Sequence, residues 1–189
     1  MPGKFAALSY CWGPESQLKT NPRYKLTTAT MAELQSESGV PLDQMPQTLQ
    51  DSIILCRDLG ISYIWIDALC IVQAQGANDY SKSHFTIIAA AADSCHSGLP
   101  QFATHKHAKT VTSPQALPRH VRLVARRHRN CPSGFHASEL DSLDPISKRG
   151  WTYQEELLST RYVKFTENHV QWRCRSSAQC MCGQGLDLH

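Results

Sequence analysis

Residues 61–72 read Ile-Ser-Tyr-Ile-Trp-Ile-Asp-Ala-Leu-Cys-Ile-Val, the longest apolar run in the chain. β-Branched and aromatic side chains dominate its first half, a pattern typical of a strand that is buried on both faces. Both Trp65 and Ile66 are therefore expected to be strongly buried. Replacing Trp65 by alanine is expected to cost about 3–5 kcal/mol of stability on this interpretation.

A helix is predicted directly before this run, over residues 47–59. Pro46 opens it, apolar side chains recur near helical spacing, and Gly60 follows its last residue, as is common at helix ends. Two further apolar segments, 5–10 and 85–92, read as strands. Strand, helix, strand is the unit of a parallel sheet with right-handed crossovers. The sequence therefore predicts an α/β fold with a mostly parallel sheet flanked by helices, and strands near 6–10, 62–67 and 85–91.

The C-terminal third has a different pattern. Residues 151–158 read as one or two helical turns, while 162–166 and 169–174 alternate in polarity around Glu167-Asn168. Two alternating segments joined by a short polar link predict a C-terminal hairpin. From residue 175 the chain becomes polar and contains glycine, so 175–189 is expected to be a disordered tail beyond a single domain at 1–174.

Positive charge is concentrated in one segment. Residues 101–138 contain no Asp or Glu but hold seven basic residues: Lys106, Lys109, Arg119, Arg122, Arg126, Arg127 and Arg129. A basic stretch can bind nucleic acid or acidic lipid. Prolines at 114, 118 and 132 interrupt it, so a solvated insertion loop is favoured and a nucleic-acid partner is not expected.

Other classes of protein find little support. No apolar run reaches the roughly 18 residues of a membrane span, and residues 1–7 do not resemble a secretory signal, so a cytoplasmic location is expected. Cys174, Cys180 and Cys182 cluster near His189 but lack a paired Cys-x-x-Cys spacing. A zinc site is therefore disfavoured against incidental thiols on the tail, and no metal is expected.

Three segments in order resemble a known family. They are Leu-Ser-Tyr-Cys-Trp-Gly at 8–13, the block from Pro46 to Gln73 that contains Tyr-Ile-Trp-Ile-Asp-Ala-Leu-Cys-Ile, and Arg-Gly-Trp-Thr-Tyr-Gln-Glu-Glu-Leu-Leu-Ser at 149–159. They resemble the conserved blocks of fungal heterokaryon-incompatibility (HET) domains, and the similarity extends over about residues 6–174. After Gln73 the family pattern usually has a further helix, so this copy is expected to be shortened there.

The resemblance implies a function. HET domains are signalling modules linked to fungal programmed cell death, so self-association or binding of protein partners is expected. They are distantly similar to Toll/interleukin-1 receptor (TIR) domains, which have a flavodoxin-like fold. Some TIR domains cleave NAD with a glutamate four residues after a tryptophan, the spacing of Trp151 and Glu155 here. The alternative function is therefore an NAD glycohydrolase, with NAD as substrate and no bound cofactor.

Glu155 and Asp67 are the candidate catalytic carboxylates on this alternative. Glycosidic cleavage passes through an oxocarbenium-like state that a carboxylate stabilises. Asp67 interrupts an apolar strand, and a buried charge needs a partner or a role. Both residues also have structural interpretations: Glu155 could pair with an arginine on the helix surface, and Asp67 could accept backbone hydrogen bonds.

Ser9, Tyr10, Trp12 and Trp151 are the candidate substrate-binding residues. The segments ending at Ser9–Tyr10 and at Asp67 each follow a predicted parallel strand, and the carboxyl ends of parallel strands meet at one edge of a sheet, where ligand crevices form. The helix that carries Glu155 is expected to dock at the same edge. The sequence therefore predicts that Asp67, Glu155 and the Ser9–Trp12 segment converge.

Overall fold

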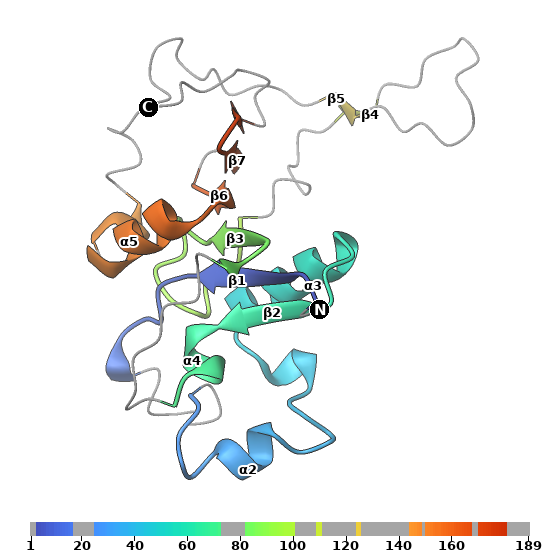
Figure 1. The fold of residues 1–189 in the computed structure, drawn as a ribbon, viewed down its shortest axis with the longest axis vertical. Coiled ribbons are helices and arrows are strands. Elements are labelled where there is room, and N and C mark those ends of the chain that lie inside the picture. Colours follow the sequence, from blue (N-terminus) through green and yellow to red (C-terminus); the bar gives the residue numbers. More distant parts are fainter. Residues whose placement is uncertain are drawn as a thin grey trace, which may run out of the picture.

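The computed structural model describes residues 3–16, 25–72, 82–100, 109–110, 124–125, 144–148, 150–167 and 170–180. Its centre is a six-stranded sheet with the order β2-β1-β3-β6-β7-β8 (Figure 1). The strands are β1 Phe5–Ser9, β2 Tyr63–Ile66, β3 Phe85–Ile88, β6 Arg161–Phe165, β7 Val170–Cys174 and β8 Ser177–Cys180. The β2, β1, β3 and β6 strands are parallel, whereas β7 and β8 continue the sheet in antiparallel fashion. The predicted α/β class with a mostly parallel sheet is confirmed.

Four helices accompany the sheet in the described part of the chain: α2 Met31–Leu34, α3 Gln47–Asp58, α4 Asp67–Cys70 and α5 Gly150–Leu158, with 3₁₀ turns η2 Leu42–Gln44 and η6 Pro145–Lys148. The helix predicted over 47–59 is confirmed. Its buried side repeats at helical spacing through Thr48, Leu49, Ser52 and Cys56. Gly60 follows it with φ +69°, a left-handed conformation that favours glycine.

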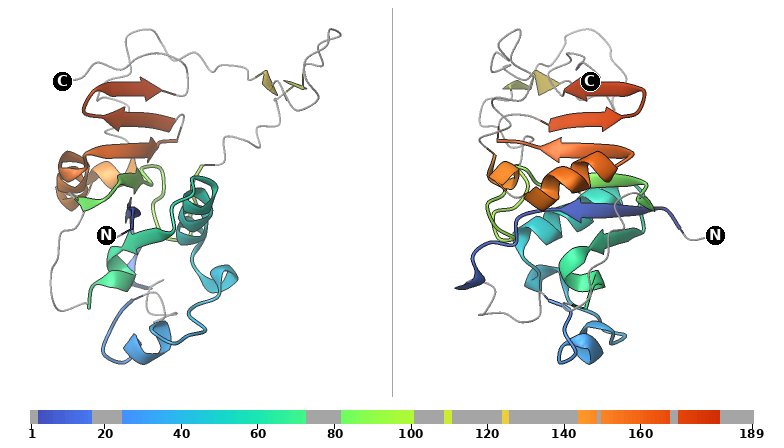
Figure 2. Two further views of the ribbon diagram at one scale, coloured as in Figure 1. Left: turned by 45° about the vertical axis from the view of Figure 1, so that its right-hand side comes forward. Right: turned by 60° about the vertical axis from the view of Figure 1, so that its left-hand side comes forward.

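The helices α3 and α5 cover opposite faces of the sheet (Figure 2). The chain moves from β1 to β2 through α3 and from β3 to β6 through α5, so the two crossovers run in opposite directions along the sheet. Because parallel crossovers are right-handed, reversing the direction places the second helix on the other face. In sheets with helices on both faces, ligands commonly bind outside the carboxyl ends of the central strands.

The two faces differ in chemistry. On the α3 face, Leu8 and Ile87 pack with Leu49 and Ile66 in the larger apolar cluster. On the α5 face the smaller cluster consists of Cys11, Ile88, Ala90, Ile146 and Tyr162. Three polar side chains on the strands also point to this second face and are almost fully buried: Ser9, Thr86 and Lys164. The sheet therefore presents an apolar surface to α3 and a mixed, partly polar surface to α5.

The strand predicted near 62–67 is confirmed as β2, but the continuation of the strand to residue 72 and its burial on both faces were wrong. Only Tyr63–Ile66 is strand, and the chain then turns into α4 at Asp67. β2 lies at the edge of the sheet, with β1 as its one neighbour. Ile66 is buried as predicted, at 2% exposed, but Trp65 is only partly buried and Tyr63 is 63% exposed. An edge strand lacks the cover that a central parallel strand has, so a run of apolar residues overstates its burial.

The C-terminal region is more ordered than the sequence suggested. β6, β7 and β8 form a three-stranded antiparallel unit where two strands were expected. The disordered tail expected from 175 was wrong for the turn and strand at 175–180, and 181–189 lies outside the described residues.

Within the basic insertion at 101–138, the two short strands β4 Lys109–Thr110 and β5 Val124–Ala125 pair antiparallel, and the rest is not described. The segment expected to be shortened, just after Gln73, also lies outside the described residues.

No helix in the described ranges has the length and apolar character that crossing a membrane requires.

Candidate functional site

The carboxyl end of β1 meets α5 through a hydrogen bond between two side chains. Ser9 is the last residue of β1, and its hydroxyl donates to Glu155 Oε2 at 2.5 Å. Side chains alternate along a strand, so Leu8 points into the α3 cluster and Ser9 points to the α5 face. Ser9 is 1% exposed, whereas Glu155 is partly buried. Residues 146 positions apart therefore meet at this edge.

A second contact joins the segment after β1 to the end of β2. The indole Nε1 of Trp12 donates to both carboxylate oxygens of Asp67, at 3.1 and 3.0 Å. Asp67 Oδ1 also accepts the backbone N–H of Ala68 at 2.6 Å. The ammonium of Lys25 lies 5.0 Å from the centre of the Trp12 ring, within cation–π range. Asp67 was expected to be buried but is only partly so, and its carboxylate accepts hydrogen bonds from Trp12 and from the Ala68 backbone.

Both candidate carboxylates contact the segment from Ser9 to Trp12, but on different faces of the sheet. Trp12 packs against the apolar cluster beneath α3, whereas Ser9 points to the α5 face, so a shared site remains a prediction. Ser9 contacts Glu155, Trp12 contacts Asp67, and Ser9 and Trp12 are only three residues apart. Three residues span at most about 11 Å, so both carboxylates lie against one short segment at the carboxyl edge of the sheet. Tyr10 does not join them, because it is 6% exposed and packs in the apolar cluster beneath α3. Trp151 is helical, and its side chain lies outside what the structure describes.

The side of α5 that faces the sheet is polar throughout its described length. Thr152, Glu155, Glu156 and Ser159 recur at helical spacing, and each makes a hydrogen bond toward the fold. Thr152 donates to the backbone oxygen of Ile146 at 2.7 Å. The Ser159 hydroxyl lies 2.7 Å from that of Thr86. The described side chains of α5 therefore position the helix by hydrogen bonds. A surface helix usually packs against the core through an apolar stripe instead.

Glu156 anchors a buried ionic network. Its Oε1 accepts from the Tyr162 hydroxyl at 2.8 Å, and its Oε2 lies 3.3 Å from the ammonium of Lys164. The Lys164 side chain is 7% exposed, so this cation depends on its carboxylate partner. Burial, and next the charge of Glu156, raise the pKa of Tyr162. Our sequence interpretation missed this network, although the alternation of β6 places Tyr162 and Lys164 on one face.

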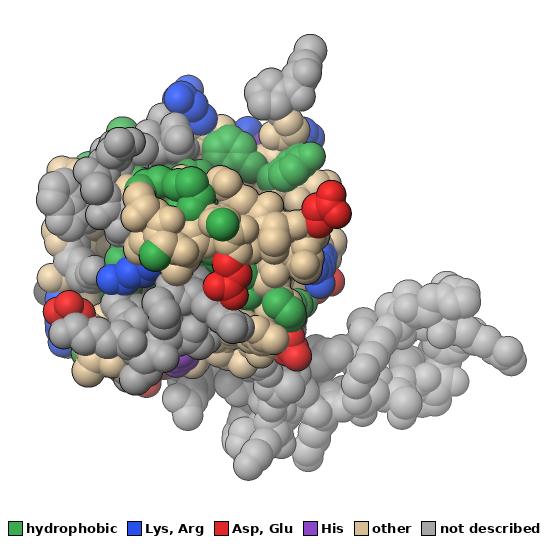
Figure 3. Space-filling view, turned by 90° about the horizontal axis from the view of Figure 1, so that it is seen from below, with side chains coloured by type: hydrophobic (Ala, Val, Ile, Leu, Met, Phe, Trp, Pro, Cys, Tyr) green, Lys and Arg blue, Asp and Glu red, His purple; other side chains and the backbone are tan. Residues whose placement is uncertain are grey.

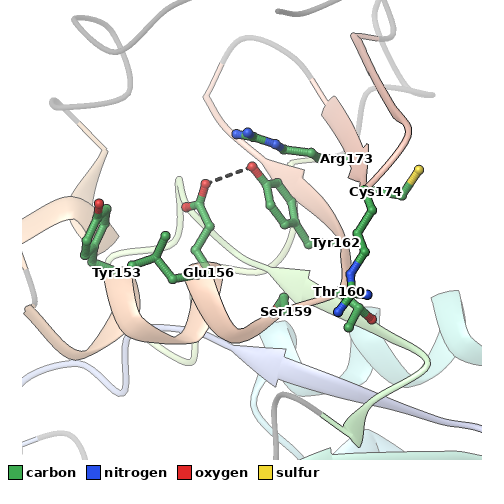
Figure 4. Close-up of a pocket in the computed structure, with 9 residues that line it drawn as sticks. Tyr153, Glu156, Ser159, Thr160, Tyr162, Arg173 and Cys174 are labelled. Carbon is green, nitrogen blue, oxygen red and sulfur yellow. Dashed lines mark hydrogen bonds between the residues drawn. The ribbon is translucent and has the colours of Figure 1, made fainter. Parts of the chain in front are cut away.

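A pocket of about 520 Å³ opens between α5, β6 and β7 (Figure 4). Tyr153 and Leu157 contribute from the helix, and Arg173 and Cys174 from β7; the remaining lining residues are Glu156, Ser159, Thr160, Tyr162 and Arg175. In Figure 4 the carboxylate of Glu156 points to the Tyr162 hydroxyl below Arg173. Glu155 does not line this pocket. The Ser9–Glu155 contact and the pocket beside Glu156 are therefore two separate polar sites next to α5. No cluster of three metal-ligating side chains occurs among the described residues.

These features define an α/β domain with a doubly wound parallel sheet and a polar site at the carboxyl edge of its central strands. The family model described as Heterokaryon incompatibility protein (HET) matches residues 5–155, from β1 to the glutamate that Ser9 contacts. The match covers most of the chain, and the chain belongs to this family. Comparisons with curated proteins and with solved structures gave no match.

Proposed function

We propose that the chain is a cytoplasmic heterokaryon-incompatibility signalling module linked to fungal programmed cell death, which acts through self-association or partner binding. Membership of the HET family supports the biological setting. The single observation that supports the mode of action is the inverted amphipathic character of α5.

The outward side of α5 carries large apolar side chains. Tyr153 is 68% exposed, Leu157 is 65% exposed and Leu158 is 44% exposed. Tyr153 and Leu157 are four residues apart and therefore share a helix face. The inward side, by contrast, is the polar series that begins at Thr152. A helix in a globular protein normally has the opposite arrangement, and an exposed apolar patch with a polar rim is typical of a protein interaction site.

Exposed apolar side chains also occur on the opposite face of the sheet. Ile54 and Leu59, on α3 and just after it, are 44% and 56% exposed. Figure 3 views the molecule from the α2 end and shows scattered hydrophobic patches on that face. Single exposed apolar residues are normal in soluble proteins. Because α3 has an ordinary buried apolar side, this second pair serves as a matched control for the α5 patch.

The double substitution Tyr153→Ser/Leu157→Ser is expected to abolish cell death on expression in a fungal host. It removes most of the outward apolar area but touches none of the hydrogen bonds that hold α5. The protein should therefore remain folded, and a change in melting temperature should be small because both side chains are more than half exposed. Light scattering after size-exclusion chromatography tests self-association of the same variant.

The control is Ile54→Ser/Leu59→Ser, which is expected to retain killing activity. Loss of death with loss of self-association indicates a second copy as the binding partner, whereas loss of death without it indicates a different protein. Full killing by a correctly folded Tyr153→Ser/Leu157→Ser variant would contradict the proposal.

A second candidate function is NAD hydrolysis with Glu155 as the catalytic carboxylate. The contact between Ser9 and Glu155, beside the Trp12–Asp67 pair, supports it. Ligands of doubly wound sheets bind outside the carboxyl ends of the strands, which is where these residues lie. The strand order β2-β1-β3 also agrees with the first part of a flavodoxin-like sheet, the fold of TIR domains. In this proposal Trp12 and Trp151 bind the substrate and Asp67 orients Trp12.

Purified protein is expected, on this second proposal, to consume NAD, and Glu155→Gln is expected to lower the rate at least about 100-fold, the effect typical of losing one charged group at a transition state. Glutamine still accepts the Ser9 hydrogen bond, so the fold is preserved. Release of nicotinamide, followed by chromatography, is the measurement. Equal rates for the intact protein and the variant would assign the Ser9–Glu155 contact a structural role.

A further inference from the structure

Among the described residues that line it, the pocket between α5 and β7 has two arginines, Arg173 and Arg175, and one carboxylate, Glu156, which pairs with Lys164. Arg173 also has partners within the fold, the Tyr162 side chain among them. With Lys164, the described charged groups comprise three cations and one carboxylate. Arg161, at the start of β6, adds a further cation close enough to Cys174 to affect its ionisation. A pocket with this balance attracts anions.

The geometry of the cations suits an oxyanion. Guanidinium groups present planar N–H pairs that match the oxygens of phosphate, and they retain their charge at all relevant pH values. Arg173 and Arg175 lie on the same strand and the turn after it, with Cys174 between them. Hydrogen bonds with Ser176, and to a smaller degree the charge of Arg161, lower the pKa of the Cys174 thiol.

The opposite wall of the pocket is apolar. It is formed by the Tyr153 ring and the Leu157 side chain on α5. The volume of about 520 Å³ falls in the range of pockets that hold small ligands, which is roughly 300–1,000 Å³. Three hydroxyl groups also line the pocket: those of Ser159 and Tyr162 already donate to Thr86 and Glu156 and can still accept hydrogen bonds, and Thr160 supplies the third. The pocket thus combines a cationic end, an aromatic wall and neutral hydrogen-bonding groups.

We propose that this pocket binds a soluble phosphate monoester that carries a ring, a molecule of mononucleotide size, with the phosphate on Arg173 and Arg175 and the ring against Tyr153. A phosphate monoester carries a charge of about −1.5 to −2 at pH 7 and three acceptor oxygens, which suit two guanidinium groups that still have further N–H donors. The site is separate from the Ser9–Glu155 edge and does not depend on either function proposed above. It shares Tyr153 and Leu157 with the outward face of α5, so a bound ligand occupies part of that face.

Isothermal titration of the intact chain with adenosine 5′-monophosphate tests the proposal, with adenosine and inorganic phosphate as separate probes. We expect saturable binding of the monophosphate with a dissociation constant below about 1 mM, and at least tenfold weaker binding of each fragment. Arg175→Gln should weaken binding about tenfold or more, because it removes a charged hydrogen-bond donor. Arg175 is exposed, so this variant is expected to fold normally.

Two variants separate the parts of the site. Tyr153→Ala should weaken binding of the monophosphate without changing the affinity for inorganic phosphate. Arg57→Gln, which removes an exposed arginine on α3, is the matched control and should bind as the unchanged protein does. Absence of saturable binding up to 5 mM (about five times the expected limit), or equal losses in Arg175→Gln and Arg57→Gln, would overturn the proposal. Neither result affects the cell-death assay, so its failure is distinguishable from failure of the proposed signalling function.

Discussion

Replacing Glu156 by alanine is expected to lower the free energy of unfolding by about 3 kcal/mol. The substitution leaves Lys164 with a side chain that is 7% exposed and without its carboxylate partner, and it removes the acceptor of the Tyr162 hydroxyl. Removing the carboxylate partner of a buried cation is among the more costly single defects in a protein. Because the Glu156 side chain is itself 29% exposed, the lower end of the range of about 3–5 kcal/mol applies. Urea denaturation measures the change.

The double variant Glu156→Ala/Lys164→Met provides the control. Methionine removes the buried cation and retains an apolar side chain of similar length, so most of the lost stability should return. Roughly 1 kcal/mol should remain missing, because the Tyr162 hydroxyl still lacks its acceptor. A Glu156→Ala variant as stable as the unchanged protein would show that water reaches Lys164 and that α5 is held by other contacts.

Ile87→Ala is expected to destabilise the protein by about 3–4 kcal/mol. Ile87 is at the centre of β3, is 0% exposed and packs in the larger apolar cluster. β3 has β1 on one side and β6 on the other, so the surrounding structure cannot collapse into the space that is left.

Trp65→Ala is the informative comparison for this prediction. Tryptophan is the larger side chain, and from the sequence alone its replacement by alanine is expected to lower the stability by about 3–5 kcal/mol. The partial burial of Trp65 on an edge strand lowers the expectation to about 1–2 kcal/mol, below that of Ile87→Ala. Denaturant midpoints of the two variants decide the order. A larger loss for Trp65→Ala would mean that β2 is covered more fully than the described residues indicate.

The parts of the fold that the sequence predicted correctly are those with strong local signals. Pro46 and Gly60 delimit α3 within one residue, and the apolar run at 5–10 gives β1. The errors occur where local signals do not distinguish two structures. Residues 67–70 are as apolar as a strand but form a helical turn, and 175–180 is polar but pairs as β8. In both segments the neighbouring chain, rather than the residue types, selects the conformation.

The candidate site divides in the same way. The rule that the carboxyl ends of parallel strands meet at one edge predicted a convergence of Ser9, Trp12, Asp67 and Glu155, and the structure contains two separate hydrogen-bonded pairs, Ser9–Glu155 and Trp12–Asp67. The rule did not separate Ser9 from Tyr10, which are adjacent but point to opposite faces of the sheet. It also gave no reason to connect Glu156 with Lys164 or to expect the basic pocket beside them.

By itself, the sequence determined the class of fold, the order of its main elements and the HET family, and it predicted that Asp67 and Glu155 both lie near the segment that follows β1. These follow from the periodicity of apolar residues, from the residues that begin and end helices, and from the three segments that resemble the HET family. Each of these signals is contained in a short stretch of the chain. Only the tertiary structure decided that β2 is an edge strand, that α5 presents its polar side to the sheet, and that Arg173 and Arg175 face Tyr153 across a pocket. Each of these depends on which distant segment lies alongside, and burial and charge pairing are set by that neighbour rather than by the residue's own place in the sequence.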